Sequence, residues 1–392
     1  MVIKVGQDRG DIVGNDDLAL QRAVDAVAAH GGGTVEVGPG TYLLRNSVRM
    51  RSNVRLAGSG EDTVLRKSDG VCTPFVIDAD YGQSKVTVED PSGFHTGMGV
   101  LVLDGAAGDW AQTVATVTHV VGNVLYLDRL LIGDYCTEQN GAVFNSFSPL
   151  VFSEVHSARA EGLCIEGNRE SNRRMNGCIG AGIYVVKSRA CSIADCQVRN
   201  FSGDGLVTAI TQDISVERCL LTGASDLGLH FGAGSARPLA RGNTCTRNGS
   251  VGLFLCWRVQ EGRFEDNLIA DNLGVGLSLG HKDTDNLFIG NTVRRNASAG
   301  IIFRLEKPTN AGHRNRFERN LIEDNVGPGV RIRPATSDLV FAGNTLRDTR
   351  TGAARTQRVG ISAEEGTARI RAVGNDFANH PDGEVEGDVE LA

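Results

Sequence analysis

The sequence lacks the features that mark several common classes of protein. It has no run of 18 or more apolar residues, so we expect no membrane-spanning helix. Its 40 basic residues are outnumbered by 47 acidic ones, and the resulting net charge of −7 argues against a general nucleic-acid-binding protein. Neither an aromatic RNA-reading motif nor a Cys/His finger spacing is present.

Signs of a disulfide-rich or secreted chain are equally sparse. The nine cysteines are odd in number and do not show the spacing of a small disulfide scaffold, so we expect most of them to be reduced and buried. The first residues, Met1 to Asp8, contain no apolar run of the kind that forms a secretion signal. The sequence as given therefore indicates a cytoplasmic protein, or a secreted or periplasmic one from which a signal has been removed.

Glycine, in contrast, is abundant and regularly placed. There are 50 glycines in 392 residues, without the Gly-X-Y period of collagen. Glycines that precede an aliphatic residue recur at spacings of 23, 23, 24, 24, 24, 29 and 31 residues, at Gly182, Gly205, Gly228, Gly252, Gly276, Gly300, Gly329 and Gly360. Alternating apolar residues within each repeat predict three short strands, which bury their apolar face only against neighbouring repeats. The period therefore predicts a parallel β-helix.

Two columns of residues share a position in successive repeats and are expected inside this solenoid. One is asparagine, whose side-chain amides can bond the backbone of the next coil at a tight bend. Its members are Asn243, Asn267, Asn291, Asn320 and Asn344, with Cys196 and Cys219 at the same position in two earlier repeats. The other is phenylalanine, predicted to stack as one column, with the members Phe264, Phe288, Phe317 and Phe341.

The N-terminal segment predicts a cap for the open end of the solenoid. Asn15-Asp16-Asp17 precedes apolar residues at helical spacing, and the expected helix ends at the glycines of 31–33. The segments DD at 16–17, LQRA at 20–23, GGGTV at 31–35, PGTY at 39–42 and GLCIEGNR at 162–169 resemble the pectate-lyase-like right-handed β-helix superfamily. The resemblance implies an all-β fold, a right-handed parallel β-helix with three strands per coil. It leaves the reaction open, because that superfamily includes lyases, hydrolases, epimerases and phage tailspikes.

Residues 75–150 interrupt the period and predict a small inserted β-subdomain. Alternating apolar residues predict strands at 86–88, 99–103, 113–117 and 124–127, with Val121-Gly122-Asn123 as a hairpin turn. We therefore expect the cap helix and first coil in 1–74, the insertion in 75–150, and the main β-helix with its C-terminal cap in 151–392. The insertion either flanks a binding cleft or packs on the solenoid.

The interior of a β-helix is filled by side chains, so a functional site is expected on its outer face. Stacked strands lie about 4.8 Å apart, which brings equivalent positions of consecutive repeats together. The repeats from 228 to 310 carry an aromatic, basic and acidic patch there, and the longer loops at 169–181 and 305–315 are expected to wall it. The expected catalytic groups are His281 and Lys282 or, for hydrolysis, Asp283 and Glu306. The expected substrate-binding residues are His230, Trp257, Arg258, Arg304, Lys307, Arg169, Arg173 and Tyr184.

Two further arrangements of reactive groups stay open. Asp204 and Asp226 form a second candidate pair for a hydrolase, although the motifs of the β-helical polygalacturonase-type hydrolases are incomplete here. Cys256 is interpreted either as half of a thiol–imidazole pair with His281, one coil away, or as a packed small residue.

No tight acidic motif calls for a metal, so the sequence predicts neither a metal site nor a cofactor. Many lyases of the resembled fold use Ca²⁺, and here Asp283, Asp285 and Glu261 are the residues that could bind it.

Together these residues indicate a carbohydrate-active enzyme that cleaves glycosidic bonds, with a carbohydrate as its partner and neither nucleic acid nor membrane; an oligomer is compatible with the sequence. Basic loops suit a carboxylate-bearing sugar and slightly favour a lyase acting on a uronate-containing glycan. In that reaction His281, Lys282 or an arginine would be the base, while Arg258 or Arg304 would neutralise the carboxylate. A glycoside hydrolase and a non-catalytic glycan-binding or structural β-helix are the alternatives.

Overall fold

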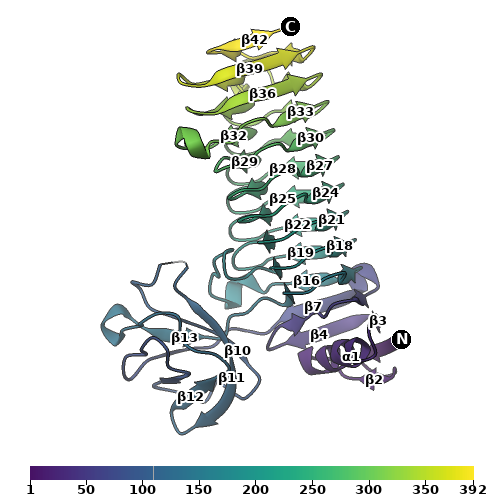
Figure 1. Ribbon diagram of the computed structural model, residues 1–392, viewed down its shortest axis with the longest axis vertical. Coiled ribbons are helices and arrows are strands. Elements are labelled where there is room, and N and C mark those ends of the chain that lie inside the picture. Colours follow the sequence, from purple (N-terminus) through teal and green to yellow (C-terminus); the bar gives the residue numbers. More distant parts are fainter. Residues whose placement is uncertain (109) are drawn as a thin grey trace.

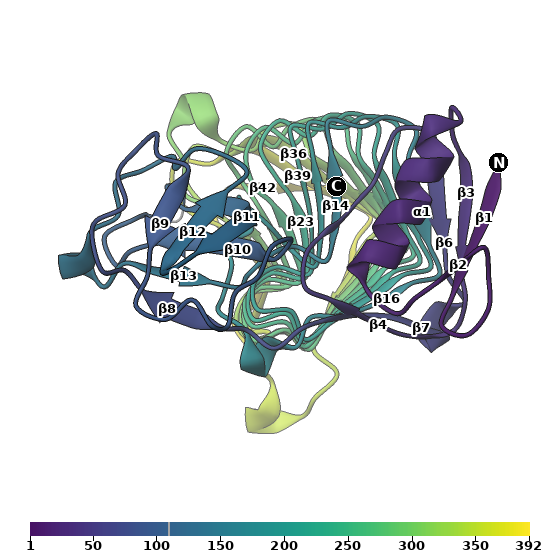
Figure 2. The ribbon, with the colours of Figure 1, turned by 90° about the horizontal axis from the view of Figure 1, so that it is seen from below.

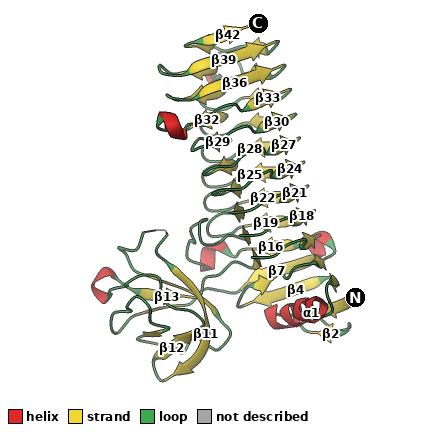
Figure 3. Cartoon of the chain, in the orientation of Figure 1, coloured by secondary structure: helices red, strands yellow, loops and turns green. Residues whose placement is uncertain are grey.

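The computed structural model describes residues 1–108 and 110–392, and it shows a long solenoid with a smaller sheet at its side (Figures 1 and 3). Three parallel sheets of 14, 11 and 11 strands run the length of the solenoid, here named sheets A, B and C, and a six-stranded sheet lies outside it. The fold is therefore the all-β parallel β-helix that the repeat predicts. No helix among the described residues is long and apolar enough to cross a membrane.

The strands of the solenoid are short, and most contain three residues. Sheet A consists of β2 (Ile12–Val13), β1 (Val2–Gly6), β3 (Gly33–Val37), β6 (Val54–Ala57), β15 (Arg159–Glu161), β18 (Ser192–Ala194), β21 (Ser215–Glu217), β24 (Leu239–Arg241), β27 (Arg263–Glu265), β30 (Leu287–Ile289), β33 (Arg316–Glu318), β36 (Ser337–Ala342), β39 (Ala368–Val373) and β42 (Val389–Leu391). Sheet B consists of β4 (Gly40–Leu44), β7 (Thr63–Lys67), β16 (Cys164–Glu166), β19 (Gln197–Arg199), β22 (Leu220–Thr222), β25 (Thr244–Thr246), β28 (Leu268–Ala270), β31 (Thr292–Arg294), β34 (Leu321–Glu323), β37 (Thr345–Arg347) and β40 (Asp376–Ala378). Sheet C consists of β5 (Val48–Arg49), β14 (Leu150–Ser153), β17 (Ile183–Val186), β20 (Leu206–Ala209), β23 (Leu229–Phe231), β26 (Leu253–Leu255), β29 (Leu277–Leu279), β32 (Ile301–Phe303), β35 (Val330–Ile332), β38 (Val359–Ala363) and β41 (Gly383–Glu386).

The sheet outside the solenoid is antiparallel and forms the insertion. Its strands, in spatial order, are β8 (Cys72–Pro74), β13 (Ala142–Phe144), β10 (Gly99–Leu103), β11 (Thr113–Val121), β12 (Val124–Leu127) and β9 (Lys85–Thr87). Figure 2 shows this sheet beside sheet C, on the opposite side of the solenoid from the N-terminal helix. The insertion has its own buried core, separate from that of the solenoid.

The predicted cap is helix α1 (Asp17–Ala29), which lies across one end of the solenoid in Figure 2. The Asp16 side chain accepts a hydrogen bond from the Ala19 amide, which satisfies a donor in the first turn. Leu20, Val24 and Val27 are fully buried, so the helix shields the apolar end of the first coil from water. Short 3₁₀ turns occur at Gly60–Asp62, Thr137–Gln139, Arg169–Ser171, Pro308–Asn310 and Gly352–Ala354.

The predicted internal columns are confirmed. Phe264 and Phe288 stack with ring centroids 4.6 Å apart, and the next two steps of the column measure 4.5 and 5.0 Å. In the asparagine ladder, Asn243 donates from Nδ2 to the Val216 carbonyl at 2.8 Å and to Oδ1 of Asn267 at 2.9 Å. These buried amides replace the hydrogen bonds that the backbone loses at the bend between sheets A and B.

A second asparagine ladder lies at the bend between sheets B and C. Its members are Asn248, Asn272, Asn296 and Asn325, and Gln357 accepts the last hydrogen bond. This ladder was not predicted from the sequence, although each of its asparagines follows a member of the first column by five residues.

The turn that leaves sheet C repeats one backbone conformation in successive coils. Its residues have positive φ angles, and each amide donates to the carbonyl just before the equivalent residue of the next coil. We call this set the turn column: Glu154, Lys187, Ile210, Gly234, Arg258 and Lys282. The side chains differ along the column while the backbone does not.

Candidate active site

The outer face of sheet C, where the insertion lies, carries most of the predicted site residues. The register pairs His230 with Phe254, Phe254 with Ser278 and Ser278 with Ile302, so these residues form one outward row. The turn after the row carries Trp257 and, one coil further, His281. Functional side chains from several coils are therefore gathered at the edge where the strands of sheet C end.

A stack of aromatic rings dominates this edge. The Trp257 ring lies 5.1 Å from the His281 ring, centroid to centroid, and 5.5 Å from the ring of Trp110. Trp110 belongs to the insertion and was not identified in the sequence analysis, although it is the only other tryptophan and follows a run of small residues. Trp110 and Trp257 remain 58% and 38% exposed, so they present apolar ring surface to solvent.

His281 and Glu306 lie within hydrogen-bonding distance of each other at this edge. Nδ1 of His281 lies 3.2 Å from Oε2 of Glu306, and both side chains are only partly exposed. Glu306 comes from the long loop after β32, which is tied back when the Lys282 amide donates to the Asn310 carbonyl at 2.6 Å. Because the carboxylate occupies Nδ1, Nε2 is the ring nitrogen left for proton transfer.

Three basic residues lie next to this pair along the chain or on the adjacent coil. Arg258 and Lys282 are neighbours in the turn column, and Lys307 follows Glu306 in the loop. Within the described residues, none of the three forms an ion pair. We call Trp110, Trp257, Arg258, His281, Lys282 and Glu306 the site patch.

The structure places Asp283 beneath the patch instead of on it, which corrects its predicted role as a solvent-facing catalytic acid. Asp283 is fully buried and accepts hydrogen bonds from the amides of Val259 and Gly280. Burial raises the pKa of Asp283 to about 7, while the nearby Arg304 guanidinium acts in the opposite direction. Asp283 therefore holds the turn in shape and cannot reach a substrate in this arrangement.

Arg304, predicted to bind substrate, is likewise committed to the protein. Its guanidinium donates to the Cys256 carbonyl at 2.9 Å and to Ser278 Oγ at 3.0 Å, and it lies 3.3 Å from the Asp283 carboxylate. It also covers the Phe254 ring at 4.6 Å. Arg304 therefore joins β26, β29 and β32 beneath the site patch.

Asp204, just before β20, and His230, in β23, form a buried pair. Oδ2 of Asp204 lies 2.8 Å from Nδ1 of His230, and the two side chains are 2% and 5% exposed. Burial alone would lower the pKa of His230, but hydrogen bonding to Asp204 and to Cys256 outweighs it and raises the pKa to about 9. His230 thus lies too deep for the substrate contact that the sequence predicts.

The opposite edge of sheet C, where its strands begin, carries three more of the predicted residues, Asp226, Arg169 and Arg173. Asp226 forms an ion pair with Arg174, and Arg169 donates to the Gly223 carbonyl at 3.1 Å. The Arg173 guanidinium covers the Phe144 ring of the insertion at 4.4 Å. This loop therefore helps to hold the insertion, and its arginines do not join the site patch.

Tyr184 lies in the outward row, but on a more N-terminal coil than His230. Its hydroxyl donates to the Cys178 carbonyl at 2.9 Å, and burial raises the pKa of Tyr184 to about 12. This side chain is thus engaged within the protein.

The residues considered for calcium do not converge. Asp283 is buried in its turn, and Asp285 forms a hydrogen-bonded ion pair with Arg314 at 2.7 Å. In the part of the chain that the structure describes, no group of three or more His, Cys, Asp or Glu side chains could hold a metal ion.

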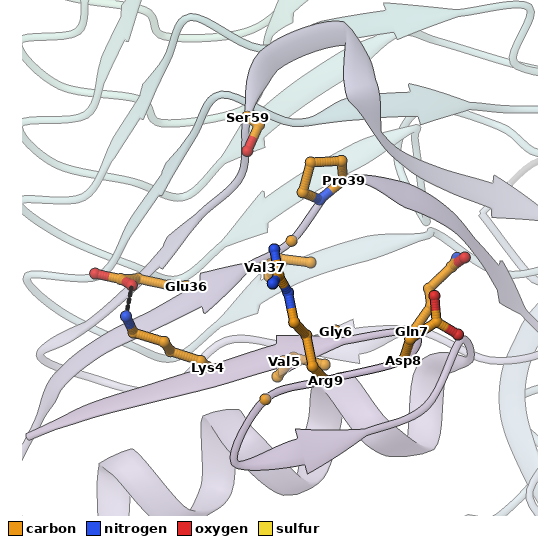
Figure 4. Close-up of a pocket in the computed structure, with 12 residues that line it drawn as sticks. Lys4, Val5, Gly6, Gln7, Asp8, Arg9, Glu36, Val37, Pro39 and Ser59 are labelled. Atoms are coloured by element: carbon orange, nitrogen blue, oxygen red, sulfur yellow. Dashed lines mark ion pairs between the residues drawn. The ribbon is translucent and has the colours of Figure 1, made fainter.

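A hollow of about 650 Å³ lies far from this face, at the N-terminal end of sheet A (Figure 4). Lys4 and Glu36 form an ion pair there, with 3.6 Å between Nζ and Oε2, and Arg9 extends across the hollow. None of the predicted site residues lines it.

Comparison with known families supports the fold over most of the chain. Residues 161–310 match the family described as "Right handed beta helix region", and residues 6–130 match "Rhamnogalacturonase A/epimerase, pectate lyase-like". The match over residues 6–130 includes the cap helix and the first coil. The match over residues 161–310 includes the coils that carry the site patch.

Among curated proteins, a mannuronan C5-epimerase of Azotobacter vinelandii (AlgE6) is 37% identical over 106 residues, which cover 24% of this chain and 11% of that relative. Among solved structures, the A-module of a second A. vinelandii epimerase (AlgE4) has a TM-score of 0.64 at 16% identity, covering 99% of this chain and 97% of that one. A structure named as a glycoside hydrolase has a TM-score of 0.53 at 12% identity, covering 99% and 96%. The structural similarities establish the fold.

Proposed function

We propose that this chain, which has the right-handed parallel β-helix fold of the pectate-lyase-like proteins, is a carbohydrate-active enzyme that removes the proton beside the carboxylate of a uronate residue in a polysaccharide. The observation that carries the proposal is the site patch, in which exposed indole surface and an imidazole–carboxylate pair lie at one edge with cations that form no ion pair among the described residues. The curated relatives are named for C5 epimerisation of mannuronan, a polymer of uronates, which supports the same choice of substrate class.

Substrate binding would use the aromatic and basic parts of the patch. A sugar ring presents C–H groups that pack on indole surface, and Trp110 and Trp257 offer that surface. The substrate carboxylate would lie against Arg258 and Lys282, whose positive charge offsets the negative charge that grows on it as the neighbouring proton leaves. Both cations project from rigid turns of the column, which fixes their position relative to His281.

Proton removal would use His281. Glu306 accepts the Nδ1 hydrogen bond and so favours the tautomer whose Nε2 carries a lone pair. Nε2 would take the C5 proton, and the electron pair left on carbon would delocalise into the carboxylate held by the cations. Return of a proton to the other face of the ring gives the C5 epimer, whereas loss of the group on C4 gives chain cleavage by elimination.

Hydrolysis has weaker support, because it needs two carboxyl groups that face the substrate. In the pair Asp283 and Glu306, the first is fully buried. In the pair Asp204 and Asp226, the first is buried against His230 and the second is bound by Arg174. Each candidate pair therefore presents at most one carboxylate to solvent.

The test is incubation of the full chain with mannuronan, polygalacturonate and a neutral glucan in deuterated water. Deuterium at C5 of a uronate supports the proposal, and the ultraviolet absorbance of unsaturated uronates then distinguishes elimination from epimerisation. Release of reducing ends without C5 exchange would show a hydrolase. Binding of a polysaccharide without any of these changes would show a non-catalytic module and overturn the proposal.

A further inference from the structure

A second hollow, of about 570 Å³, lies at the turn that leads from sheet C to sheet A, on the coils that precede the site patch. We call it the turn hollow. Members of the turn column line it together with residues that follow each turn, among them Glu154, His156, Lys187, Arg189, Ile210 and Gly234. None of these residues belongs to the site patch, and the proposed reaction does not use the hollow.

Gly234 leaves a gap in the turn column. Its φ angle of 73° is positive, like those of Lys187, Ile210 and Arg258, but a side chain added at Gly234 would meet no atom within 4 Å. Ile210, one coil earlier, is 57% exposed and lines the same hollow. The turn hollow therefore combines open space with an apolar surface on which one face of a sugar ring can pack.

Basic side chains supply the charge of the turn hollow. Arg189 is exposed and forms no ion pair among the described residues. Lys187 lies 3.3 Å from a Glu154 carboxylate oxygen, but these side chains are 57% and 67% exposed. Water weakens such a pair, so Lys187 can exchange Glu154 for the carboxylate of a ligand. Two cations against one carboxylate favour an anionic ligand.

A row of backbone bridges connects the turn hollow with the site patch. After each turn, one residue pairs in parallel with its equivalent in the next coil, in the order His156, Arg189, Gln212, Ala236, Gln260 and Thr284. The first four line the hollow, whereas the last two follow Arg258 and Lys282 of the site patch by two residues. Lys187 lies three coils from Arg258, which is about 14 Å at about 4.8 Å per coil. A polysaccharide of a few sugar residues can therefore occupy both places at once.

We infer that the turn hollow is a remote subsite for the polyuronate chain, in which Arg189 and Lys187 bind the carboxylate of one sugar residue while another residue of the same chain occupies the site patch. One face of the bound ring packs on Ile210, in the gap at Gly234. The polysaccharide thus lies along the solenoid axis, beside the turn column. The inference rests on the proposed function, because it takes a polyuronate as the substrate.

The experiment measures the affinity of the native full chain for mannuronan, polygalacturonate and a neutral glucan by affinity electrophoresis, and measures turnover separately. We expect Arg189→Gln to raise Kd for the preferred uronate polymer about 3- to 10-fold and to leave kcat within about twofold of wild type, because this cation binds the chain away from the reacting residue. Arg247→Gln, on an exposed arginine at the bend between sheets B and C, should leave both quantities unchanged. An unchanged Kd in Arg189→Gln would overturn the inference without affecting the proposed function.

Filling the gap in the turn column is the second test. Gly234→Gln places a side chain where neighbouring coils already carry one at a positive φ, and it should also raise Kd for the uronate polymer at least about threefold. Gly374→Gln, at another glycine with a positive φ and open space, is the control for backbone strain. Wild-type affinity in a folded Gly234→Gln protein, judged by circular dichroism, would contradict the inference; if this variant does not fold, Arg189→Gln decides.

Binding and turnover together separate the two proposals. Uronate binding without any reaction would overturn the proposed function, while the Kd values of the variants would still decide the role of the turn hollow. If the wild-type protein binds neither uronate polymer, or binds the neutral glucan equally well, the choice of substrate class is wrong and the inference fails with it.

Discussion

The indole rings of Trp110 and Trp257 stack across the boundary between the insertion and the solenoid, with centroids 5.5 Å apart and planes inclined by 21°. The insertion therefore contacts the same edge of sheet C that carries His281 and Glu306. Of the two roles expected for residues 75–150 from sequence, the stacked rings show packing on the solenoid, and the flanking of a binding cleft stays a prediction.

Removing Trp110 tests this shared surface. We expect Trp110→Ala to raise KM for the polysaccharide about 2- to 10-fold with a smaller change in kcat, because an aromatic contact is worth roughly 0.5–1.5 kcal/mol. Steady-state kinetics would measure the change. Tyr81→Ala, on an exposed part of the insertion, is the matched control. An unchanged KM in Trp110→Ala and also in Trp257→Ala would place sugar binding elsewhere.

Replacing His281 tests the proton transfer. His281→Ala and Lys282→Ala should each lower kcat at least about 10²-fold, because they remove a base and a charge that stabilises the transition state. His95→Ala removes an exposed histidine of the insertion and should retain full activity. Near-wild-type turnover in both site variants would show that the catalytic residues lie elsewhere, with Asp204 and Asp226, at the other edge of the sheet, as the next candidates.

Truncation in the phenylalanine column tests the contribution of the stack. Phe288 lies between rings 4.6 and 4.5 Å away, so Phe288→Ala leaves a cavity that the neighbouring coils cannot close. We expect a loss of roughly 3–5 kcal/mol in the free energy of unfolding, measured by chemical denaturation. Leu273→Ala, on a 71% exposed side chain, should change stability by less than about 0.5 kcal/mol. A loss below about 1 kcal/mol in Phe288→Ala would be inconsistent with a packed column.

A buried lysine makes stability depend on pH. Lys67 is 1% exposed, lies 4.9 Å from the centre of the Phe147 ring and donates to Asn172, and it forms no ion pair within the described residues. Burial lowers the pKa of Lys67 from 10.5 to about 7. Between these values the unfolded chain binds the additional proton, so this lysine makes the protein more stable as pH rises.

The expected contribution of Lys67 is about 1.4 kcal/mol per pH unit between pH 8 and 9.5, read as the difference in unfolding free energy between wild type and Lys67→Met. Lys85→Met, on an exposed lysine of the insertion, should follow the wild-type pH dependence. If the unfolding free energies of wild type and Lys67→Met changed with pH in parallel, Lys67 would not contribute this pH dependence.

The architecture was predictable because its determinants are local and repeated. One coil position requires an amide and another an apolar ring, so Asn267 and Phe288 identify the register without knowledge of distant contacts. The same reasoning could have found Asn272, because its ladder has the same period.

The site was less predictable, since it depends on the direction of turns and on contacts distant in sequence. Asp283 follows Lys282 directly, yet the positive φ of Lys282 turns the chain so that the carboxylate binds backbone amides inside. No repeat relates Trp110 to Trp257, because the insertion has its own fold. Sequence spacing therefore located the face of the solenoid but not which charged groups remain open on it.

In the turn column the backbone conformation is the same in every coil, whereas the side chains differ. One backbone geometry and one pattern of amide hydrogen bonds recur along the column. The residues with this geometry nevertheless include cations, an aliphatic residue and a glycine: Lys187, Ile210, Gly234, Arg258 and Lys282. A side chain of the turn column can therefore be replaced in one coil without altering the backbone that orients the side chain of the next coil. A new substrate specificity at this surface would require different side chains in the turn column and no change in the backbone of the β-helix.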